Sequence, residues 1–299
     1  MPNLQIDAVR KLLRENPVVT EGATLDDMRK GMDAMANMAP RLSNVSSEPV
    51  DAGGVPAEWF TFDDSDSDSE RVLLYVHGGG YVMGSVESHR CLLERLAVAI
   101  RGRVLALDYR LAPETPFPAP VEDTLAAYRW LLATGSRASK IAIGGDSAGG
   151  GLTLSALVAI RDAGLELPAC GTPISPWTDM EGTGDSMKTR ADVDPMVQKA
   201  AIIDLGQTYL AGSDPKDPKA SPLYSDLSGL PPLLIQVGDC ETLLDDTTRI
   251  EPRLTNAGVD VTVEVWDEMI HVWHLFAPML DKGQEAINRI GEFIMGHTG

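Results

Sequence analysis

A glycine-rich turn between two regular segments constrains this chain of 299 residues more than any other feature. Residues 141–143 (IAI) form a short β-branched run that is typical of a buried strand. The sequence GDSAG at 145–149 follows at once, and from Leu152 onward apolar residues recur at helical spacing. The sequence therefore predicts a strand, a tight turn and a helix, with Ser147 at the tip of the turn.

The glycines of this turn have a steric explanation. A residue at such a tip has a strained backbone, and its flanks must carry almost no side chain if neighbouring backbone is to pass close by. The helix after Ser147 directs free N–H groups and the positive end of its dipole at the serine oxygen. The pattern G-x-S-x-G is typical of a serine nucleophile, although a short glycine-rich pattern also suits a nucleotide-binding turn.

A second glycine run follows another apolar strand. Residues 72–76 are apolar, and HGGG at 77–80 follows with no polar spacer. Backbone N–H groups can turn inward there because no Cβ is in the way. Acyl transfer needs such donors around its developing oxyanion, in addition to the N–H of the residue after the nucleophile, here Ala148. The two motifs together predict a serine hydrolase.

Three histidines follow Ser147 in the chain. His297 lies in the last three residues, where chain ends usually fray. His271 follows the strand-like run 261–266 and a short loop, and we expect it to open a helix at the carboxyl end of a strand. His274 is expected inside that helix as a structural residue. His271 is therefore the predicted general base.

The orienting acid of such a site lies between the serine and the histidine along the chain. The strand-like run 232–237 leads into a loop with four carboxylates: Asp239, Glu241, Asp245 and Asp246. The acid would accept the second imidazole N–H and stabilise the imidazolium. Asp245 and Asp246 are typical of the first turn of a helix. Periodicity alone does not choose between Asp239, nearest the strand end, and Glu241, which has the longer reach.

Three motifs in register resemble the hormone-sensitive lipase family of bacterial esterases, often called family IV. They are HGGG at 77–80, DYRLAPE at 108–114 and GDSAGG at 145–150, and the resemblance extends from about Val72 to the final helix. It implies an α/β-hydrolase fold and the hydrolysis of esters with short acyl chains.

The resemblance also implies the acid. Family members commonly carry it in the pattern acid-x-Leu-x-Asp, which residues 241–245 (ETLLD) fit and Asp239 does not. The family usually has Asp followed by Pro, whereas this chain has Glu followed by Thr, as in a glutamate-using subgroup. Glu241 is therefore the predicted acid, with Asp239 in reserve.

Further roles follow from the same resemblance. The oxyanion donors would be the N–H groups of Gly79, Gly80 and Ala148. His77 would brace the glycine loop, and Asp108 and Arg110 would support the end of the next strand.

Seven strand-like runs indicate an α/β fold: 58–62, 72–76, 104–107, 141–143, 171–174, 233–237 and 261–265. After the second run they alternate with helical stretches, which favours a mostly parallel sheet covered by helices on both faces. The strands before Val72 are expected to form an antiparallel edge.

Two stretches interrupt this alternation. Residues 1–42 contain two amphipathic helices, one with Leu4, Val9, Leu12 and Leu13 on a face and one with Leu25, Met28, Met32, Met35 and Met38. Residues 178–223 have a helical centre near 196–210. The resemblance implies a discontinuous helical cap of residues 1–45 and 178–220 over a core of residues 46–177 and 221–299. The methionine stripe is typical of helix packing, and it would also suit a wall that accepts varied acyl groups.

The net charge of −19 and the pI of about 4.5 disfavour binding to nucleic acid or to anionic membranes. Cys91, Cys170 and Cys240 form no paired or metal-spaced set, and Cys240, which has no base of its own, is expected to be inert. Without an apolar leader or an apolar run of about 20 residues, a cytoplasmic protein with no membrane span is expected. The acidic segment 63–70 lacks the glycine of a calcium loop and is expected to be a hairpin tip.

These observations predict a carboxylesterase that needs no cofactor and no metal. An amidase, deacetylase or lactonase would share every motif, and a ligand-binding receptor of the same fold is the alternative outside enzymes. His271 argues against the receptor. The expected partner is a small-molecule ester, with no nucleic acid, and a homodimer is the candidate assembly.

Overall fold

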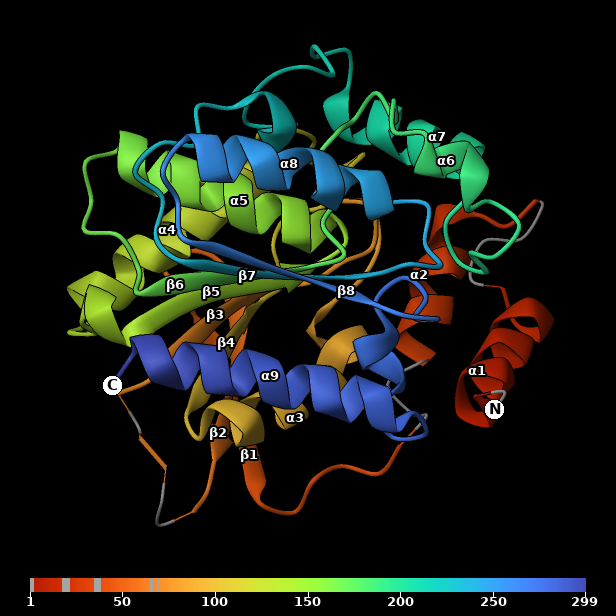
Figure 1. The fold of residues 1–299 in the computed structure, drawn as a ribbon. Helices are drawn as coiled ribbons and strands as arrows, with labels where there is room; N and C mark the ends of the chain where they lie inside the picture. Colours follow the sequence, from red (N-terminus) through yellow and green to blue (C-terminus); the bar gives the residue numbers. More distant parts are fainter. Residues whose placement is uncertain (1–2, 18–21, 35–38, 65–66, 69) are drawn as a thin grey trace.

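The computed structural model describes residues 3–17, 22–34, 39–64, 67–68 and 70–299 (Figure 1). A single sheet of eight strands runs through it in the order β1-β2-β4-β3-β5-β6-β7-β8. The strands are β1 (Val45–Asp51), β2 (Pro56–Phe62), β3 (Val72–Val76), β4 (Arg103–Leu107), β5 (Ile141–Asp146), β6 (Cys170–Ile174), β7 (Leu233–Gly238) and β8 (Val261–Trp266).

The sheet is mostly parallel, as predicted. β2 pairs antiparallel with both β1 and β4, and every neighbouring pair from β4 to β8 is parallel. This arrangement confirms the predicted fold class. The antiparallel edge before Val72 consists of β1 and β2, of which only β2 stands among the predicted strand-like runs.

The sequence misses β1 because it carries little strand pattern. Its side chains are mostly exposed, and Pro49 lies within it. An edge strand pairs on one side only, so it tolerates a proline that a central strand would not.

The acidic segment 63–70 is not a hairpin tip. β4 lies between β2 and β3 in the sheet, so this segment connects two strands that are not neighbours. Asp68 forms an ion pair with Lys140 at 2.9 Å, which attaches the segment to the start of β5. Residues 65, 66 and 69 lie outside the described part of the chain.

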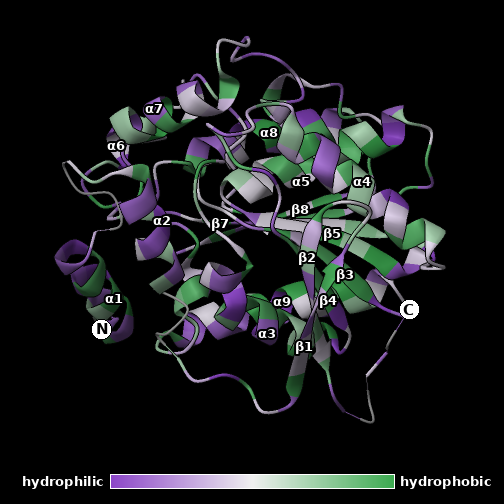
Figure 2. Cartoon of the chain, turned by 180° about the vertical axis from the view of Figure 1, so that it is seen from behind, coloured by the Kyte–Doolittle hydropathy of each residue, from purple (hydrophilic) through white to green (hydrophobic). Residues whose placement is uncertain are grey.

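Helices cover both faces of the sheet (Figure 1). On one face lie α3 (Val86–Ile100) and α9 (Asp281–His297), and on the other lie α4 (Ala119–Ala133), α5 (Ala148–Asp162) and α8 (Leu244–Asn256). The central strands are largely hydrophobic (Figure 2) and β3 and β5 are buried throughout.

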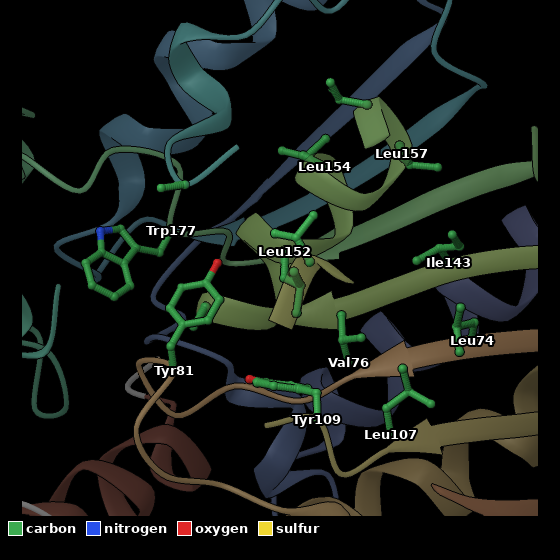
Figure 3. Packing of buried hydrophobic residues seen from close by; sticks show 14 of the residues in the cluster. Leu74, Val76, Tyr81, Leu107, Tyr109, Ile143, Leu152, Leu154, Leu157 and Trp177 are labelled. Carbon is green, nitrogen blue, oxygen red and sulfur yellow. The ribbon is translucent and has the colours of Figure 1, made fainter. Parts of the chain in front are cut away.

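Successive side chains of a strand enter opposite halves of the core. On β3, Leu74 and Val76 pack with Ile143 and Leu152 on the α5 side (Figure 3). Leu73 and Tyr75 pack on the α3 side instead. The sheet is therefore a rigid base whose carboxyl-end loops carry the site.

Four helices gather at one side of the molecule in both Figure 1 and Figure 2: α1 (Leu4–Glu15), α2 (Leu25–Ala34), α6 (Ser186–Thr189) and α7 (Lys199–Leu210). In α1, Val9 and Leu13 are buried as expected, but Leu4 is 79% exposed and Ile6 takes its place. The expected face was wrong at its first residue.

The methionine stripe is partly visible. Leu25, Met28 and Met32 of α2 are half-buried against the larger core cluster. Met35 and Met38 lie outside the described residues. Over the described residues, no helix is both long enough and apolar enough to cross a membrane.

Candidate active site

Ser147 stands between β5 and α5 in a strained conformation. Its φ is 56° and its ψ is −119°, and the helix begins at the next residue. A non-glycine residue in such a region costs on the order of 1–3 kcal/mol and persists only where its surroundings hold it. Here its N–H donates to the carbonyl of Ile174 at 2.8 Å, and its own carbonyl accepts from Gly151 at 3.0 Å.

The flanking glycines are required because backbone passes directly over them. A Cβ on Gly145 or Gly149 would lie closer than 3.0 Å to the carbonyl oxygen of Val76, and one on Gly149 would also overlap His77. Real Cβ atoms essentially never approach that closely. The tight turn is thus packed against the end of β3, which brings the two glycine motifs together.

Ser147, His271 and Glu241 form one hydrogen-bonded chain. The Oγ of Ser147 lies 2.9 Å from Nε2 of His271, and Nδ1 of His271 lies 2.6 Å from Oε2 of Glu241. A carboxylate only accepts, so Nδ1 carries the proton and Nε2 faces the serine as an acceptor. His271 can therefore take a proton from Ser147.

Both oxygens of Glu241 are used. Oε2 meets His271, and Oε1 accepts from the Ser175 hydroxyl at 2.8 Å and from the Gly238 N–H at 2.6 Å. The reserve residue, Asp239, contacts the Cys240 thiol instead. Burial of the thiol, together with the nearby Asp239 carboxylate, raises the pKa of Cys240 to about 11. A thiol with so high a pKa is unreactive near neutral pH.

The electrostatics favour a charged imidazole at His271. Burial by itself would lower its pKa, but the adjacent Glu241 carboxylate outweighs burial, and the pKa is raised above 6.5. The more distant carboxylates of Asp194 and Asp146 act in the same direction. A protonated imidazole at this position is thereby stabilised.

The glycine loop presents free donors beside the serine. Gly79 and Gly80 have φ values of 119° and 63°, in the region that favours glycine. A Cβ on Gly80 would lie 2.7 Å from Leu205, and one on Gly79 would overlap the Met83 carbonyl. Within the part of the chain that the structure describes, nothing accepts a hydrogen bond from the amides of three residues: Gly79, Gly80 and Ala148.

Sequence reasoning missed a buried cluster behind this loop. The carboxylate of Asp146 accepts from the Tyr75 hydroxyl at 2.7 Å and the Gly78 N–H at 3.1 Å, and it lies 3.2 Å from Nε2 of His89. Burial would raise the pKa of Asp146, but His89 and Tyr75 lower it to about 2. The cluster anchors Gly78, the first glycine of the loop. Of these residues, only Asp146 lies within a recognisable motif, as the variable residue before the serine of G-x-S-x-G.

The three predicted support residues, His77, Asp108 and Arg110, each contact a neighbouring segment. His77 is buried and stacks on the Tyr109 ring at 4.3 Å between centroids. Asp108 accepts from the Val86 N–H at the start of α3 at 2.7 Å, and Arg110 pairs with Asp123 at 2.7 Å.

The segment after His271 differs from the expectation. His271 lies in a turn and opens no long helix, since a 3₁₀ turn follows at Trp273–Phe276 and α9 begins only at Asp281. Val272 has a left-handed φ of 47°, which interrupts helical geometry at once. His274 is buried and contacts the Gln236 amide oxygen at 2.7 Å, as a structural residue would.

An apolar cavity of about 130 Å³ opens at Ser147. The cavity is lined by Ser147, Asp146, His271, Gly79 and Gly80. Its walls also include Met32 of α2, several residues of α7 and residues 196–198, which precede α7. The other wall residues are Met83, His89, Trp177, Met196, Val197, Gln198, Ala201, Ile202, Leu205, Val272 and Leu275. Over the described residues, no group of three or more His, Cys, Asp or Glu side chains is placed to hold a metal.

Comparison with known proteins identifies the family and the fold. Residues 73–275 match the family model described as alpha/beta hydrolase fold. An acetyl-hydrolase of Streptomyces hygroscopicus is 43% identical over 299 residues, covering 100% of this chain and 99% of the relative. An esterase of Acinetobacter venetianus is 30% identical over 267 residues, covering 89% and 87%.

Solved structures give the same result at the level of the whole fold. An esterase described as from the bacterial hormone-sensitive lipase family is 52% identical and superposes with a TM-score of 0.96, covering 100% of both chains. A hormone-sensitive lipase from a metagenome library is 37% identical, with a TM-score of 0.94 and 98% coverage of both chains. This chain therefore belongs to the bacterial hormone-sensitive lipase family, the serine carboxylic ester hydrolases with the α/β-hydrolase fold.

Proposed function

We propose that this protein is a carboxylesterase that hydrolyses short-acyl esters through an acyl-enzyme on Ser147. His271 is the general base and Glu241 the orienting acid. The observation that carries the proposal is the hydrogen-bonded chain from the Ser147 hydroxyl through the His271 imidazole to the Glu241 carboxylate.

In the first half of the reaction, the Ser147 oxygen attacks the ester carbonyl carbon while His271 removes its proton. The negative charge that develops on the carbonyl oxygen is bound by the amides of Gly79, Gly80 and Ala148. The imidazolium, stabilised by Glu241, then gives its proton to the departing alkoxide. The products of this half are an alcohol and the acyl-serine.

In the second half, water takes the place of the alcohol. His271 removes a proton from the water as the water oxygen attacks the acyl carbon, and the same three amides bind the oxyanion. Collapse of this intermediate returns the proton to the Ser147 oxygen and releases a carboxylic acid.

The size of the cavity supports short acyl groups. Its volume of about 130 Å³ is small beside the roughly 300–1,000 Å³ of pockets for drug-sized ligands. We assign residues 1–45 and 178–220 to a cap over a core of residues 46–177 and 221–299. The assignment is supported by Met32 and Leu205, which come from the two cap segments and share the cavity wall.

A second candidate is deacetylation, in which the acetyl group is removed from an amide and not from an ester. The relative named acetyl-hydrolase, which matches this chain over its full length, supports acetyl removal, and its name specifies neither bond. Hydrolysis rates for p-nitrophenyl esters of increasing chain length, measured beside an N-acetyl anilide, separate the two activities. An esterase gives its highest kcat/KM on the acetate or butyrate ester and little turnover of the anilide.

Replacing the nucleophile tests the proposal directly. Ser147→Ala should lower kcat for p-nitrophenyl butyrate by at least about 10⁴-fold, because loss of a nucleophile in such triads costs at least that much. The fold should persist, since only one oxygen is removed. Thermal unfolding checks this.

Ser155→Ala is the matched control. Its hydroxyl is buried on the same helix, α5, and has no hydrogen-bond partner among the described residues. The control should hydrolyse the ester at the wild-type rate. A folded Ser147→Ala protein with near wild-type turnover would refute the assignment.

A further inference from the structure

Glu241 and Thr242 are the two positions at which this chain departs from the Asp-Pro pair of the pattern it resembles. Thr242 stands where proline is usual. A proline has neither an N–H nor a hydroxyl, so threonine brings two hydrogen-bond donors to this position. Both donors contact the same carboxylate, that of Asp194, and the hydroxyl also lies 3.3 Å from the carbonyl oxygen of Val197.

Asp194 is buried in the segment before α7, with 3% of its surface exposed. Its Oδ2 accepts from the N–H of Thr242 at 2.8 Å and from its hydroxyl at 3.1 Å. Its Oδ1 accepts from the N–H groups of Met196 at 2.8 Å and Val197 at 2.9 Å. All four partners are donors, which suits an ionised carboxylate.

These contacts fix the backbone that carries Glu241. The peptide unit between Glu241 and Thr242 is held at its N–H by Asp194 and at its carbonyl by the N–H of Leu244, at 3.3 Å. The next carbonyl, that of Thr242, accepts from the Ser186 hydroxyl at 2.6 Å. A glutamate side chain has one more rotatable bond than an aspartate side chain. Its carboxylate is therefore held in one place only if the backbone of the residue is held as well.

The same carboxylate also holds one wall of the cavity. Met196 and Val197, whose amides bind Oδ1, both line the cavity at Ser147 and His271. Asp194 therefore joins the cavity wall to the loop that carries the acid.

We propose that Asp194 is a positioning residue of this hydrolase. Through Thr242 it holds Glu241 in line with His271, and through the amides of Met196 and Val197 it sets the cavity wall at the same time. The inference rests on the proposed function, because positioning Glu241 matters only if Glu241 orients the base.

The charge of Asp194 provides a readout that a purely structural role would not move. Three carboxylates raise the pKa of His271 against the effect of burial: Glu241 after β7, Asp194 before α7 and Asp146 at the end of β5. The buried His274 is a further titratable neighbour, since the charge of His271 lowers the pKa of His274. Removing the charge of Asp194 should lower the pKa of His271 and move the acid limb of kcat/KM to lower pH.

Two variants separate position from charge. Asp194→Asn replaces one oxygen with an NH₂ group, so the side chain can no longer accept from both pairs of donors. Thr242→Val removes the hydroxyl but keeps the N–H of residue 242 and the charge of Asp194. Asp192→Asn is the matched control. Asp192 lies two residues before Asp194 and is exposed, and its substitution removes the same negative charge.

Turnover of p-nitrophenyl butyrate, its pH profile and thermal unfolding are measured for all three. Asp194→Asn should lower kcat on the order of 10- to 100-fold, as misplacement of reacting groups by a fraction of an ångström does, and should shift the acid limb to lower pH. Thr242→Val should lower kcat by roughly 2- to 10-fold, the scale of one hydrogen bond, with the acid limb unchanged. Asp192→Asn should match the wild type.

An Asp194→Asn protein with wild-type kcat and an unmoved acid limb overturns the inference, whatever its melting temperature. If that variant does not fold, Thr242→Val decides, and wild-type kcat there overturns it. Ser147→Ala is assayed in parallel. An active Ser147→Ala protein refutes the proposed function, whereas an inactive one beside a fully active Asp194→Asn protein refutes only this inference.

Discussion

Glu241 reaches His271 from a fully buried position in which each carboxylate oxygen already has a partner. Its contacts to Ser175 and Gly238 leave one orientation in which Oε2 faces Nδ1 of His271. Asp239 lies two residues earlier, with its N–H bonded to the Trp266 carbonyl. At the scale of single residues, geometry therefore distinguishes two acids between which strand periodicity alone does not choose.

Glu241→Gln tests the role of the acid. The amide keeps the size of the side chain but cannot stabilise the imidazolium, and the equivalent change in a serine protease costs about 10⁴-fold in kcat. Because Glu241 raises the pKa of His271, the acid limb of wild-type kcat/KM should lie above pH 6.5. Activity is lost as pH falls through that pKa, and the limb of the residual activity of Glu241→Gln should move to lower pH.

Asp239→Asn is the comparison for this experiment. It should retain most of the activity, since the Asp239 carboxylate meets the Cys240 thiol. Loss of activity in Asp239→Asn with Glu241→Gln nearly unaffected would transfer the role to Asp239.

At the scale of elements, the Arg29 side chain attaches α2 to the glycine loop. Arg29 donates to the Val82 carbonyl at 2.8 Å, to the Ala112 carbonyl at 3.1 Å and to both oxygens of Glu114 at 2.7 Å. Val82 belongs to the turn that begins at Gly79, because its N–H donates to the Gly79 carbonyl. The helix that contributes Met32 to the cavity is thus tied to the loop that carries the proposed oxyanion donors.

Arg29→Met should loosen this attachment. The substitution keeps an apolar stem but leaves the Val82 and Ala112 carbonyls without their donor, which should cost about 1–3 kcal/mol of stability. We expect a lower melting temperature together with a lower kcat on p-nitrophenyl butyrate.

Lys30→Met is the matched control, since Lys30 is 73% exposed and pairs with Asp26 on the same helix. A pair so exposed contributes little to stability, and both readouts should therefore stay near wild type. Equal behaviour of the two variants would exclude a special role for Arg29.

At the scale of the whole molecule, the chain has 44 acidic and 25 basic residues. One buried acidic residue, Asp246, is expected to make stability depend on pH near neutrality. Asp246 is fully buried at the start of α8 and accepts from the N–H groups of Thr178 and Asp179. Burial raises its pKa from 3.8 to about 7, although these donors and Arg249 oppose the effect. The two segments that meet there are the start of the 178–220 insertion and the core.

This pKa predicts a stability gain on mild acidification. Between pH 3.8 and about 7 the folded protein holds a proton on Asp246 that the unfolded chain has lost, so this group adds stability as pH falls. Asp246→Asn cannot titrate. Urea unfolding at pH 7.5 and pH 5 should therefore show a wild-type advantage over Asp246→Asn that is larger at pH 5.

The buried histidines do not disturb this comparison. The pKa values of His77 and His274 are lowered to about 3 by burial, which destabilises the fold as pH falls below 6.5. Both proteins share that effect, and it cancels in the difference. A difference between wild type and Asp246→Asn that does not change with pH would contradict the shifted pKa.

Much of this molecule can be predicted from the amino-acid sequence. The strand, turn and helix around Ser147, the glycine loop after β3 and the mostly parallel sheet all follow from patterns within about a dozen residues. Such patterns are reliable here because they express local sterics. Gly79 and Gly80, for example, have φ values of 119° and 63°, a backbone conformation that glycine adopts without the steric cost that a side chain would bring.

Other features depended on the tertiary structure. The position of β4 between β2 and β3, the pairing of the proline-containing β1, and the contacts of Asp146 with Tyr75 and His89 leave no periodic trace in the sequence. The meeting of Asp194 with Thr242 joins residues 48 apart, and that of Ser147 with His271 joins residues 124 apart. Local propensity shows which residues are able to do chemistry, but only the packing of distant segments brings a particular donor within reach of a particular acceptor.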